Sequence, residues 1–216
     1  MLERYWPTFG LRITTPRLEL RVPEDHELEE LAAVAERGVH APGERPFLTP
    51  WTEGPALDRA RSVLQGHWER LATWSTTDWR LGLGVFDVDD LTPLGMVTLR
   101  AQDFGVLREV ATTSWLGLAH QRQGLGTQAR LAVLTLAFDH LGAQSAVTEV
   151  FPDNAASQGV SRRLGYQPDG ISLGRRGDEA LVSDRLRLTR EQWAAVDSSG
   201  VAVEGLDGVC RAMLGA

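Results

Sequence analysis

The feature that most constrains the fold is a turn with two glycines, placed between a strand-like segment and a long helix-like segment. Residues 114–118 have strand character and run into a short polar turn. Gly124 and Gly126 then open a run that continues without a breaker to Leu141. Unpaired amides at a helix start, together with the positive end of the helix dipole, favour a phosphate group. The segment therefore predicts a phosphate-binding loop, to which Arg122 would add a charge-assisted contact.

Two better-known phosphate loops fit this segment less well. A P-loop needs Gly-Lys-Ser/Thr, and the sequence contains no lysine, which excludes it. A dinucleotide fingerprint would find its third small residue in Ala129 and its acidic residue in Glu149. That fingerprint normally follows the first strand of a βαβ unit, whereas this loop lies mid-chain after hairpin-like strands, so a Rossmann site is disfavoured. Taken alone, Gly-x-Gly is also compatible with a tight turn before a core helix.

A second segment strengthens the phosphate-loop interpretation. A strand-like run over residues 143–151 is followed by Asn154 and Ser157, and then by a short helix that ends in Leu-Gly-Tyr. In chain order the motifs are Gln121-x-x-Gly124-x-Gly126, Asn154-x-x-Ser157 and Leu164-Gly165-Tyr166. This order and spacing resemble the GCN5-related N-acetyltransferase (GNAT) superfamily, and most of all its branch of ribosomal-protein N-terminal acetyltransferases. Residues 13–21 also resemble the first strand of that branch, and the match extends over roughly residues 11–190.

The resemblance implies an α/β (α+β) fold with a mixed, mostly antiparallel central sheet, two splayed strands and helices on both faces. It implies one acetyltransferase domain over residues 1–197, followed by a C-terminal tail over residues 198–216. It also implies acetyl-CoA as the acyl donor, held by the strand before the loop, by the loop itself and by the Asn154 segment. The cofactor-binding residues expected on this basis are Leu116, Gly117, Leu118, Gln121, Arg122, Gln123, Gly124, Leu125, Gly126, Thr127, Asn154 and Ser157.

The catalytic residues are carried over from the same resemblance. A serine at the position of Ser157 is proposed in the related branch to protonate the departing thiolate; the simpler alternative is an ordinary residue in the first turn of a helix. Other branches use a tyrosine where this chain has Ser161. Relatives often carry a carboxylate four residues before the tryptophan, where this chain has Ala111. Glu109, one pleat back on the same face, is then the nearest candidate base, with a plain surface glutamate as the alternative. Asn154 would contact the pantetheine amide or cap a helix.

Composition excludes several other classes of protein. The 216 residues, 43% of them hydrophobic, suit one soluble globular domain. A net charge of −7 argues against a general nucleic-acid binder. The single cysteine, Cys210, rules out an intramolecular disulfide, and the five histidines lack ligand spacing, so no metal is expected. No apolar run approaches the roughly eighteen residues of a membrane span, so we expect a cytoplasmic protein without membrane contact. A homodimer is left open.

Hydrophobic periodicity and breakers place the remaining elements. Phe47, Trp51 and Glu53 lie in a proline-rich loop and are weak candidates for contact with the acceptor. In chain order the predicted elements are a first strand at 11–22, a helix from 23 to Gly38, an ordered loop at 40–56, a helix at 57–73, a hairpin at 78–87 and 94–102, a strand at 109–118, a helix at 124–141, a strand at 143–151, a closing hairpin at 167–176 and 179–188 around Gly177-Asp178, a capped helix at 189–193 and a loose tail from 198, with docking of 209–214 as an open alternative.

The function that follows is direct acetyl transfer from acetyl-CoA to a primary amine, either a peptide N-terminus or a small-molecule amine. Two alternatives stay open. A non-catalytic acyl-CoA-binding or regulatory domain is plausible because Ala111 replaces the usual acid. A drug-modifying enzyme of the aminoglycoside-acetylating type would differ only in its acceptor.

Overall fold

One mixed sheet organises the molecule. The computed structural model describes residues 2–176 and 178–216. The strands are β1 (Arg12–Thr14), β2 (Leu18–Arg21), β3 (Asp78–Asp87), β4 (Pro93–Gln102), β5 (Glu109–Leu116), β6 (Ser145–Val150), β7 (Gln167–Arg176), β8 (Glu179–Thr189) and β9 (Ala202–Glu204). Within the described residues they form one sheet in the order β7-β8-β6-β5-β4-β3-β2-β1-β9. Only the β5–β6 pair is parallel there, and the other pairs are antiparallel.

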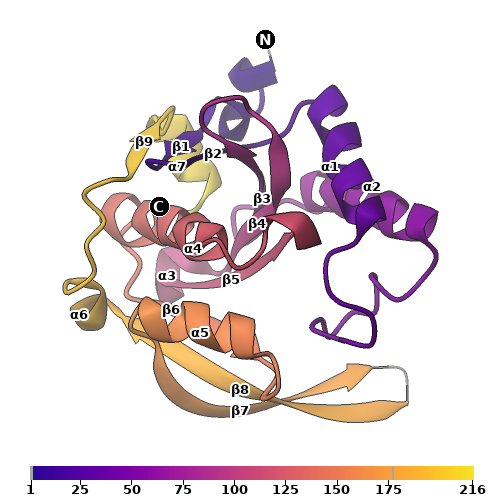
Figure 1. Cartoon of the computed structure of the whole chain (residues 1–216). Helices are drawn as coiled ribbons and strands as arrows, with labels where there is room; N and C mark the ends of the chain where they lie inside the picture. Colours follow the sequence, from indigo (N-terminus) through magenta and orange to yellow (C-terminus); the bar gives the residue numbers. More distant parts are fainter. Residues whose placement is uncertain (1, 177) are drawn as a thin grey trace.

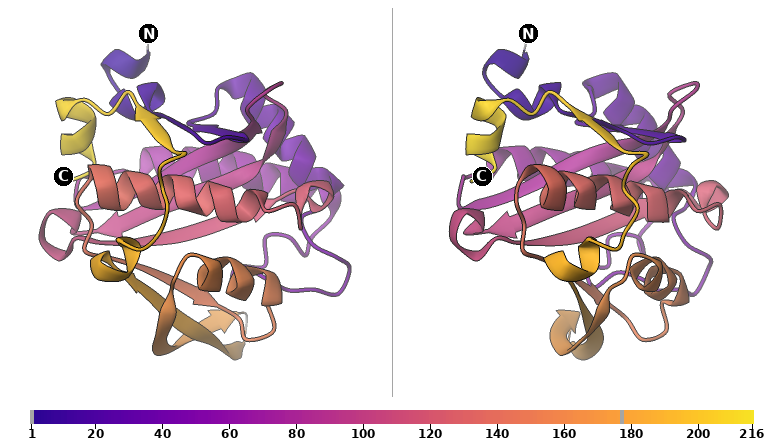
Figure 2. Two further views of the ribbon diagram at one scale, coloured as in Figure 1. Left: turned by 60° about the vertical axis from the view of Figure 1, so that its left-hand side comes forward. Right: turned by 90° about the vertical axis from the view of Figure 1, so that its left-hand side faces the viewer.

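Helices cover both faces of this sheet, as expected from the resemblance (Figures 1 and 2). The helices are α1 (Asp25–Arg37), α2 (Ala56–Ala72), α3 (Phe104–Leu107), α4 (Leu125–Thr135), α5 (Ala155–Arg163), α6 (Arg190–Trp193) and α7 (Gly208–Met213). Figure 2 shows α4 on one face of the sheet, with α1 and α2 on the opposite face. A π-helical turn, Leu136–His140, extends α4, and 3₁₀ turns occur at Leu2–Arg4, Pro7–Gly10 and Leu118–His120. The expected mixed α/β architecture is confirmed.

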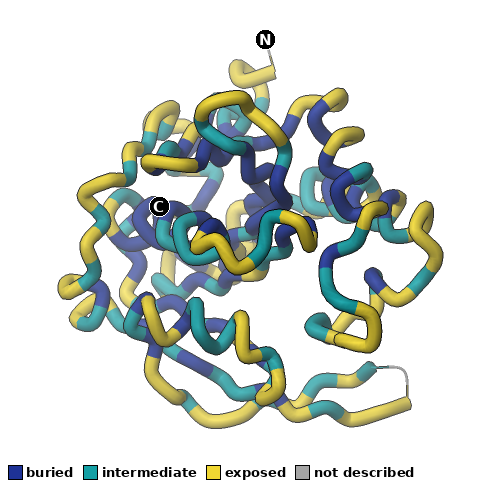
Figure 3. Tube along the Cα trace, in the orientation of Figure 1, coloured by how far each residue is buried: buried dark blue, intermediate teal, exposed yellow. Residues whose placement is uncertain are grey.

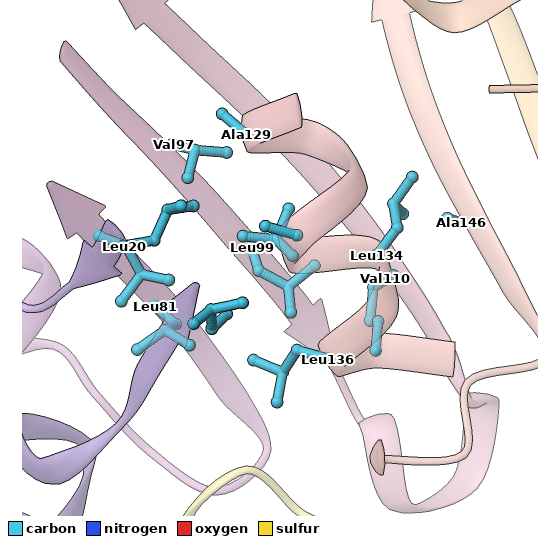
Figure 4. Packing of buried hydrophobic residues seen from close by; sticks show 14 of the residues in the cluster. Leu20, Leu81, Val97, Leu99, Val110, Ala129, Leu134, Leu136 and Ala146 are labelled. Carbon is cyan, nitrogen blue, oxygen red and sulfur yellow. The ribbon is translucent and has the colours of Figure 1, made fainter. Parts of the chain in front are cut away.

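Each face of the sheet has its own apolar cluster. The larger cluster joins α4 to the sheet, and Figure 4 shows Ala129, Leu134 and Leu136 of the central helix against strand residues such as Leu99. The smaller cluster lies between the α1–α2 pair and the other face. Burial of these apolar side chains is the main stabilising term, and it fixes α4 over the centre of the sheet.

The first predicted strand is in fact a hairpin of two strands. The chain reverses at Thr15-Pro16-Arg17, and β1 pairs antiparallel with β2. The Thr15 hydroxyl accepts hydrogen bonds from the backbone N–H groups of Arg17 and Leu18. Side chains alternate with the same period of two in both strands, so alternation alone does not reveal the turn that separates them.

Helix α2 packs on a different stripe from the predicted one. Leu57 and Trp68 are exposed, whereas Ala60, Val63 and His67 face the core. The apolar spacing correctly predicts a helix, but the face of the helix that packs on the core differs from the predicted face and carries smaller side chains. The prediction of core packing is therefore wrong for Leu57 and Trp68.

Residues 198–216 complete the fold and are not a loose tail. β9 pairs antiparallel with β1 and forms the edge of the sheet. Cys210 of α7 and Leu214 just after the helix are fully buried, whereas Val209 is exposed. Figure 3 shows buried stretches of the chain gathered in the interior and exposed ones around the outside. The predicted loose tail is therefore an edge strand and a docked helix, and the docking considered for residues 209–214 is observed.

The closing hairpin β7–β8 and the proline-rich loop meet at one end of the molecule. The two strands of the hairpin pair from Gln167↔Arg187 to Arg176↔Glu179. Gly177, at the predicted tip, lies outside the described residues. Leu48 of the loop packs over Gly174, and Glu53 pairs with Arg176. The loop is thereby tied to β7 and ordered, as predicted.

Candidate active site

The sheet opens between β5 and β6. These parallel strands pair only from Glu109↔Ser145 to Ala111↔Val147. Beyond that point β5 continues to pair with β4 as far as Leu116, but no longer with β6. The expected splay of two central strands therefore begins after Ala111.

The backbone groups that point into this opening follow from strand alternation. On the β6 side, the Arg108 carbonyl accepts a hydrogen bond from Ser145 N–H; on the β4 side, Gly117 N–H donates to Leu94. Backbone groups alternate between the two edges of a strand. The N–H and C=O groups of the even-numbered residues of β5 therefore point toward β6. The Ala111↔Val147 pair already uses Thr112 N–H, so the N–H groups free of β6 belong to Ser114 and Leu116.

This alternation corrects two of the predicted cofactor contacts. Gly117 N–H is bonded to Leu94 and Leu118 N–H to the Gly38 carbonyl, each at 2.9 Å. Neither donor is free to pair with an added ligand strand. Gly117 is instead required by packing, because a Cβ there would overlap Val34. Of the three residues predicted to offer backbone groups, only Leu116 has its N–H directed into the opening.

The glycine loop forms a concave set of free amides. Arg122 and Gly124 both adopt positive φ, at 61° and 82°. Such left-handed residues next to a helix start direct successive N–H groups toward a shared point. Within the described residues, the amides of residues 122–126 make no hydrogen bond to the protein, whereas Thr127 N–H already bonds the Gly124 carbonyl. The loop therefore offers unpaired donors together with the positive end of α4.

Gly126 is not explained by protein packing. A Cβ at this position would meet only Leu116, at an ordinary 3.8 Å, and a Cβ at Gly124 would meet nothing within 4 Å. The positive φ of Gly124 requires glycine, but Gly126 has no such requirement. The space in front of the first turn of α4 is therefore open for a ligand that approaches the backbone. Leu125 between them is buried and anchors the helix.

Two glutamines and an arginine hold the loop in place. The Gln121 side chain donates to the Val39 and Leu116 carbonyls at 2.7 and 2.9 Å, so its amide nitrogen is committed to the protein. Gln123 donates to the Ala119 carbonyl at 3.1 Å. Arg17, in the β1–β2 turn, donates to the Gln123 carbonyl at 2.9 Å. Arg17 therefore adds a second positive charge beside the exposed Arg122, a contribution that sequence reasoning missed.

Asn154 and Ser157 begin helix α5, which follows β6. Asn154 Oδ1 accepts a hydrogen bond from Ser157 N–H at 3.0 Å, so Asn154 is the N-cap. The Ser157 hydroxyl makes no hydrogen bond to any described residue, and its side chain is half-buried. Ser157 is thus available to a ligand, whereas one oxygen of Asn154 serves the helix.

Glu109 lies at the closed end of the opening. It accepts a hydrogen bond from the Ser145 hydroxyl at 2.6 Å and pairs with Arg187. The Glu109 hydrogen bond is the main reason that the pKa of Arg187 is raised. Its carboxylate is thus committed to Ser145 and Arg187, which favours a role as an ion-pair partner over that of the base.

An aromatic cluster covers the other face of the opening. The ring centroids of Phe47 and Trp51 are 5.3 Å apart, and those of Trp51 and Trp115 are 5.7 Å apart. His40 Nε2 lies 2.9 Å from the Thr52 hydroxyl and holds the start of the loop. The proline-rich loop therefore brings two half-buried aromatic residues against the strand that borders the opening.

Sequence comparison decides the family. The model of the acetyltransferase (GNAT) domain matches residues 17–167, from the β1–β2 turn to the start of β7. This chain belongs to the GNAT family. As a GNAT acetyltransferase it is an acyltransferase, and the matched segment contains the opening, the glycine loop and the Asn154 segment described above.

Solved structures place the same fold in related enzymes. RimJ from Mycobacterium smegmatis, in complex with CoA-disulfide, superposes with a TM-score of 0.69 at 17% identity, covering 88% of this chain and 90% of that one. RimL, a ribosomal L7/L12 α-N-protein acetyltransferase, gives 0.62 at 15% identity, covering 81% and 95%. A chimera of the spermidine N-acetyltransferase SpeG from Vibrio cholerae with hSSAT gives 0.60 at 15%, covering 83% and 99%. At these identities the likeness shows the fold of this GNAT acetyltransferase.

The described residues contain neither a metal-binding cluster nor a membrane-spanning helix. No group of three or more His, Cys, Asp or Glu side chains there is placed to hold a metal ion. No helix in the same part of the chain is long and apolar enough to cross a membrane.

Proposed function

We propose that this GNAT acetyltransferase transfers the acetyl group of acetyl-CoA to a primary amine. The observation that carries the proposal is the set of free amides over residues 122–126, with open space in front of Gly126. A diphosphate is the part of CoA that suits such donors at a helix start. RimJ and RimL have the same fold, and their structures contain CoA as a disulfide, which supports this choice of donor.

The acyl-bearing arm of CoA would lie along the open edge of β5. The Thr112 carbonyl, the N–H and carbonyl of Ser114 and the Leu116 N–H would pair with its amides as an added strand does. An N–H of this edge would also donate to the thioester carbonyl and stabilise the oxyanion as it forms. Ser157, at the start of α5, would donate its hydroxyl proton to the departing sulfur.

The acceptor amine would enter from the face that carries Trp51 and Trp115. The aromatic rings there can contact an ammonium before it loses its proton. An α-amine has an unperturbed pKa of roughly 8, compared with roughly 10.4 for a lysine, so an α-amine is far more often neutral near pH 7. Water then suffices as the proton acceptor. This argument favours a peptide N-terminus over a lysine side chain, and a small-molecule amine of similar pKa is equally suited.

The experiment is a thiol-release assay with acetyl-CoA and a panel of acceptors: N-terminal peptides, polyamines and aminoglycosides. We expect release of CoA with at least one N-terminal peptide or small amine. Calorimetric binding of acetyl-CoA without thiol release across the panel would instead support a regulatory acyl-CoA-binding domain. Release with aminoglycosides alone would support the drug-modifying alternative.

The role of Ser157 is tested separately. Its hydroxyl is unbonded, so Ser157→Ala leaves the N-cap hydrogen bond from its backbone to Asn154 intact. We expect a fall in kcat of about tenfold or more with little change in KM for acetyl-CoA. Full turnover in this variant would remove Ser157 from the mechanism and leave water as the proton donor.

A further inference from the structure

Helix α4 carries a buried positive charge that no carboxylate of the described residues balances. Arg130 is 4% exposed. Its only hydrogen bond within the described chain runs from Nη1 to the Ser161 hydroxyl of α5, at 2.9 Å, and its Nε has no partner. Burial lowers the pKa of Arg130, and the nearby Tyr166 hydroxyl only partly offsets this effect. Burying an unpaired charge is costly, so its retention calls for a reason.

Two buried hydroxyls without partners lie beside it. Tyr166 Oη and Thr112 Oγ1 are both enclosed, and neither makes a hydrogen bond of ordinary geometry within the described chain. Tyr166 N–H donates to the carbonyl of Ser161 at 3.1 Å, and the hydroxyl of the same Ser161 accepts from Arg130. Burial raises the pKa of Tyr166, whereas the neighbouring Arg130 charge and Thr112 hydroxyl act in the opposite direction. A cation and two hydroxyls that lack partners form a polar patch inside the core. We call Arg130, Ser161, Tyr166 and Thr112 the Arg130 cluster.

The Arg130 cluster lies at the closed end of the opening between β5 and β6. Thr112 is the first residue of β5 beyond its last pair with β6. Arg130 lies five residues into α4, roughly 8 Å from its start at 1.5 Å per residue. Thr112 lies four residues before Leu116, roughly 13 Å of strand. An extended arm that begins at the glycine loop and follows β5 would therefore bring its far end to the cluster.

We propose that the Arg130 cluster is a thiolate site, in which the Arg130 guanidinium stabilises the negative sulfur of CoA. This inference rests on the proposed function, because it takes the end of the CoA arm as its ligand. In the reaction, the amine nitrogen bonds to the acetyl carbon while the carbon–sulfur bond breaks. The electron pair stays on sulfur, and the nitrogen loses its proton to water. Arg130 then holds the thiolate until Ser157 or water protonates it.

The first test compares CoA with desulfo-CoA, which lacks the sulfur, by calorimetry on the wild-type protein between pH 6 and 8. An ordinary thiol has a pKa of roughly 8.5, so a bound thiol ionised by Arg130 would make CoA bind more tightly as the pH rises. We expect a gain of about tenfold for CoA and none for desulfo-CoA. Equal pH dependence of the two ligands would overturn the thiolate site alone. Failure of both ligands to bind would overturn the proposed function as well.

Two variants then separate binding from packing. Arg130→Met keeps the length of the side chain and removes its charge. We expect it to abolish the CoA-specific pH dependence and lower kcat about a hundredfold, with the Kd of desulfo-CoA within about twofold of wild type. Arg130→Lys should restore part of the pH dependence. Arg122→Met is the matched control at the glycine loop, and it should weaken both ligands alike.

Stability provides the final discrimination. Removal of an unpaired buried charge should leave the Tm of Arg130→Met equal to or above that of wild type. A lower Tm combined with equal weakening of CoA and desulfo-CoA would overturn the proposal, because Arg130 would then serve only the packing of α4 and α5. The wild-type comparison decides the proposal by itself if the variants fail to fold.

Discussion

Gly126 and its neighbours show how much of this site depends on the backbone of single residues. The loop amides are free because two residues with positive φ turn them outward, and the side chain that would cover them is missing at Gly126. At the same scale, Gln121 and Asn154 use polar atoms to hold the loop and the helix in place. A residue named by a motif can therefore serve the ligand directly or hold the residues that do.

Gly126→Ala tests the open space in front of α4. The new methyl group would make only an ordinary contact with Leu116, so stability should be retained or rise by roughly 0.5 kcal/mol. It would occupy ligand space, and we expect the KM for acetyl-CoA to rise about tenfold, equivalent to about 1.4 kcal/mol. Gly208→Ala, at another open helix start, is the matched control and should leave KM unchanged. An unchanged KM in Gly126→Ala would remove the loop from the donor site.

Glu109→Gln tests the charge at the closed end of the opening. Glu109 pairs with Arg187 and accepts from Ser145, so the variant should lose roughly 0.2–1 kcal/mol of stability, typical of a partly exposed pair. Because the Glu109 carboxylate is committed to Arg187 and Ser145, kcat should stay within about twofold of wild type. A large fall in kcat with an intact Tm would instead establish Glu109 as the base.

At the scale of elements, helix α2 brings a buried histidine against the sheet. His67 is 5% exposed. Burial, reinforced by the charge of Arg70, lowers its pKa from 6.5 to about 4. The folded state therefore binds this proton less readily than the unfolded state. The stability contribution is fully present above pH 6.5 and is lost as the pH falls from 6.5 toward 4.

Protonation of His67 should therefore lower the free energy of unfolding in mild acid. The shift of about 2.5 pH units corresponds to a loss of about 3 kcal/mol on acidification through this window. Urea unfolding at several pH values measures it. His67→Leu should flatten the dependence between pH 6.5 and 4, and His26→Leu, at an exposed site, should not. An unchanged slope in His67→Leu would contradict the assignment.

Helix caps and hairpins could be predicted from the sequence where the residues that define them are close together in the chain. The helix caps, the hairpin β3–β4 and the Asn154 N-cap follow from residues a few positions apart. The free donor of Ser114 was missed because it depends on which edge of β5 faces β6, and only the pairing register decides this. Arg130 was missed because a single arginine in an apolar helix gives no signal of burial. The small residues of the C-terminal segment gave no period by which β9 and α7 could be recognised.

At the scale of the whole molecule, the two ends of the chain close one side of the fold. β9 pairs with β1, and the Trp74 indole donates to the Met213 carbonyl at 3.3 Å. Leu214 is fully buried against the main core. The segment that sequence reasoning left as a tail is therefore part of the same cooperative unit.

Leu214→Ala measures how strongly that end contributes. Deleting a fully buried leucine side chain should cost about 2–5 kcal/mol in the free energy of unfolding. Val209→Ala, on the exposed side of α7, should cost less than about 0.5 kcal/mol. Denaturant titration of both variants gives the comparison, and equal small losses would show that the C-terminal helix is only loosely attached.

The pairing of β9 with β1 also bears on the order in which the protein is made. A ribosome makes β1 roughly 190 residues before β9, its partner at this edge. Until β9 follows, β1 presents an open edge to other nascent chains, so a stop codon before residue 202 should favour aggregation during translation.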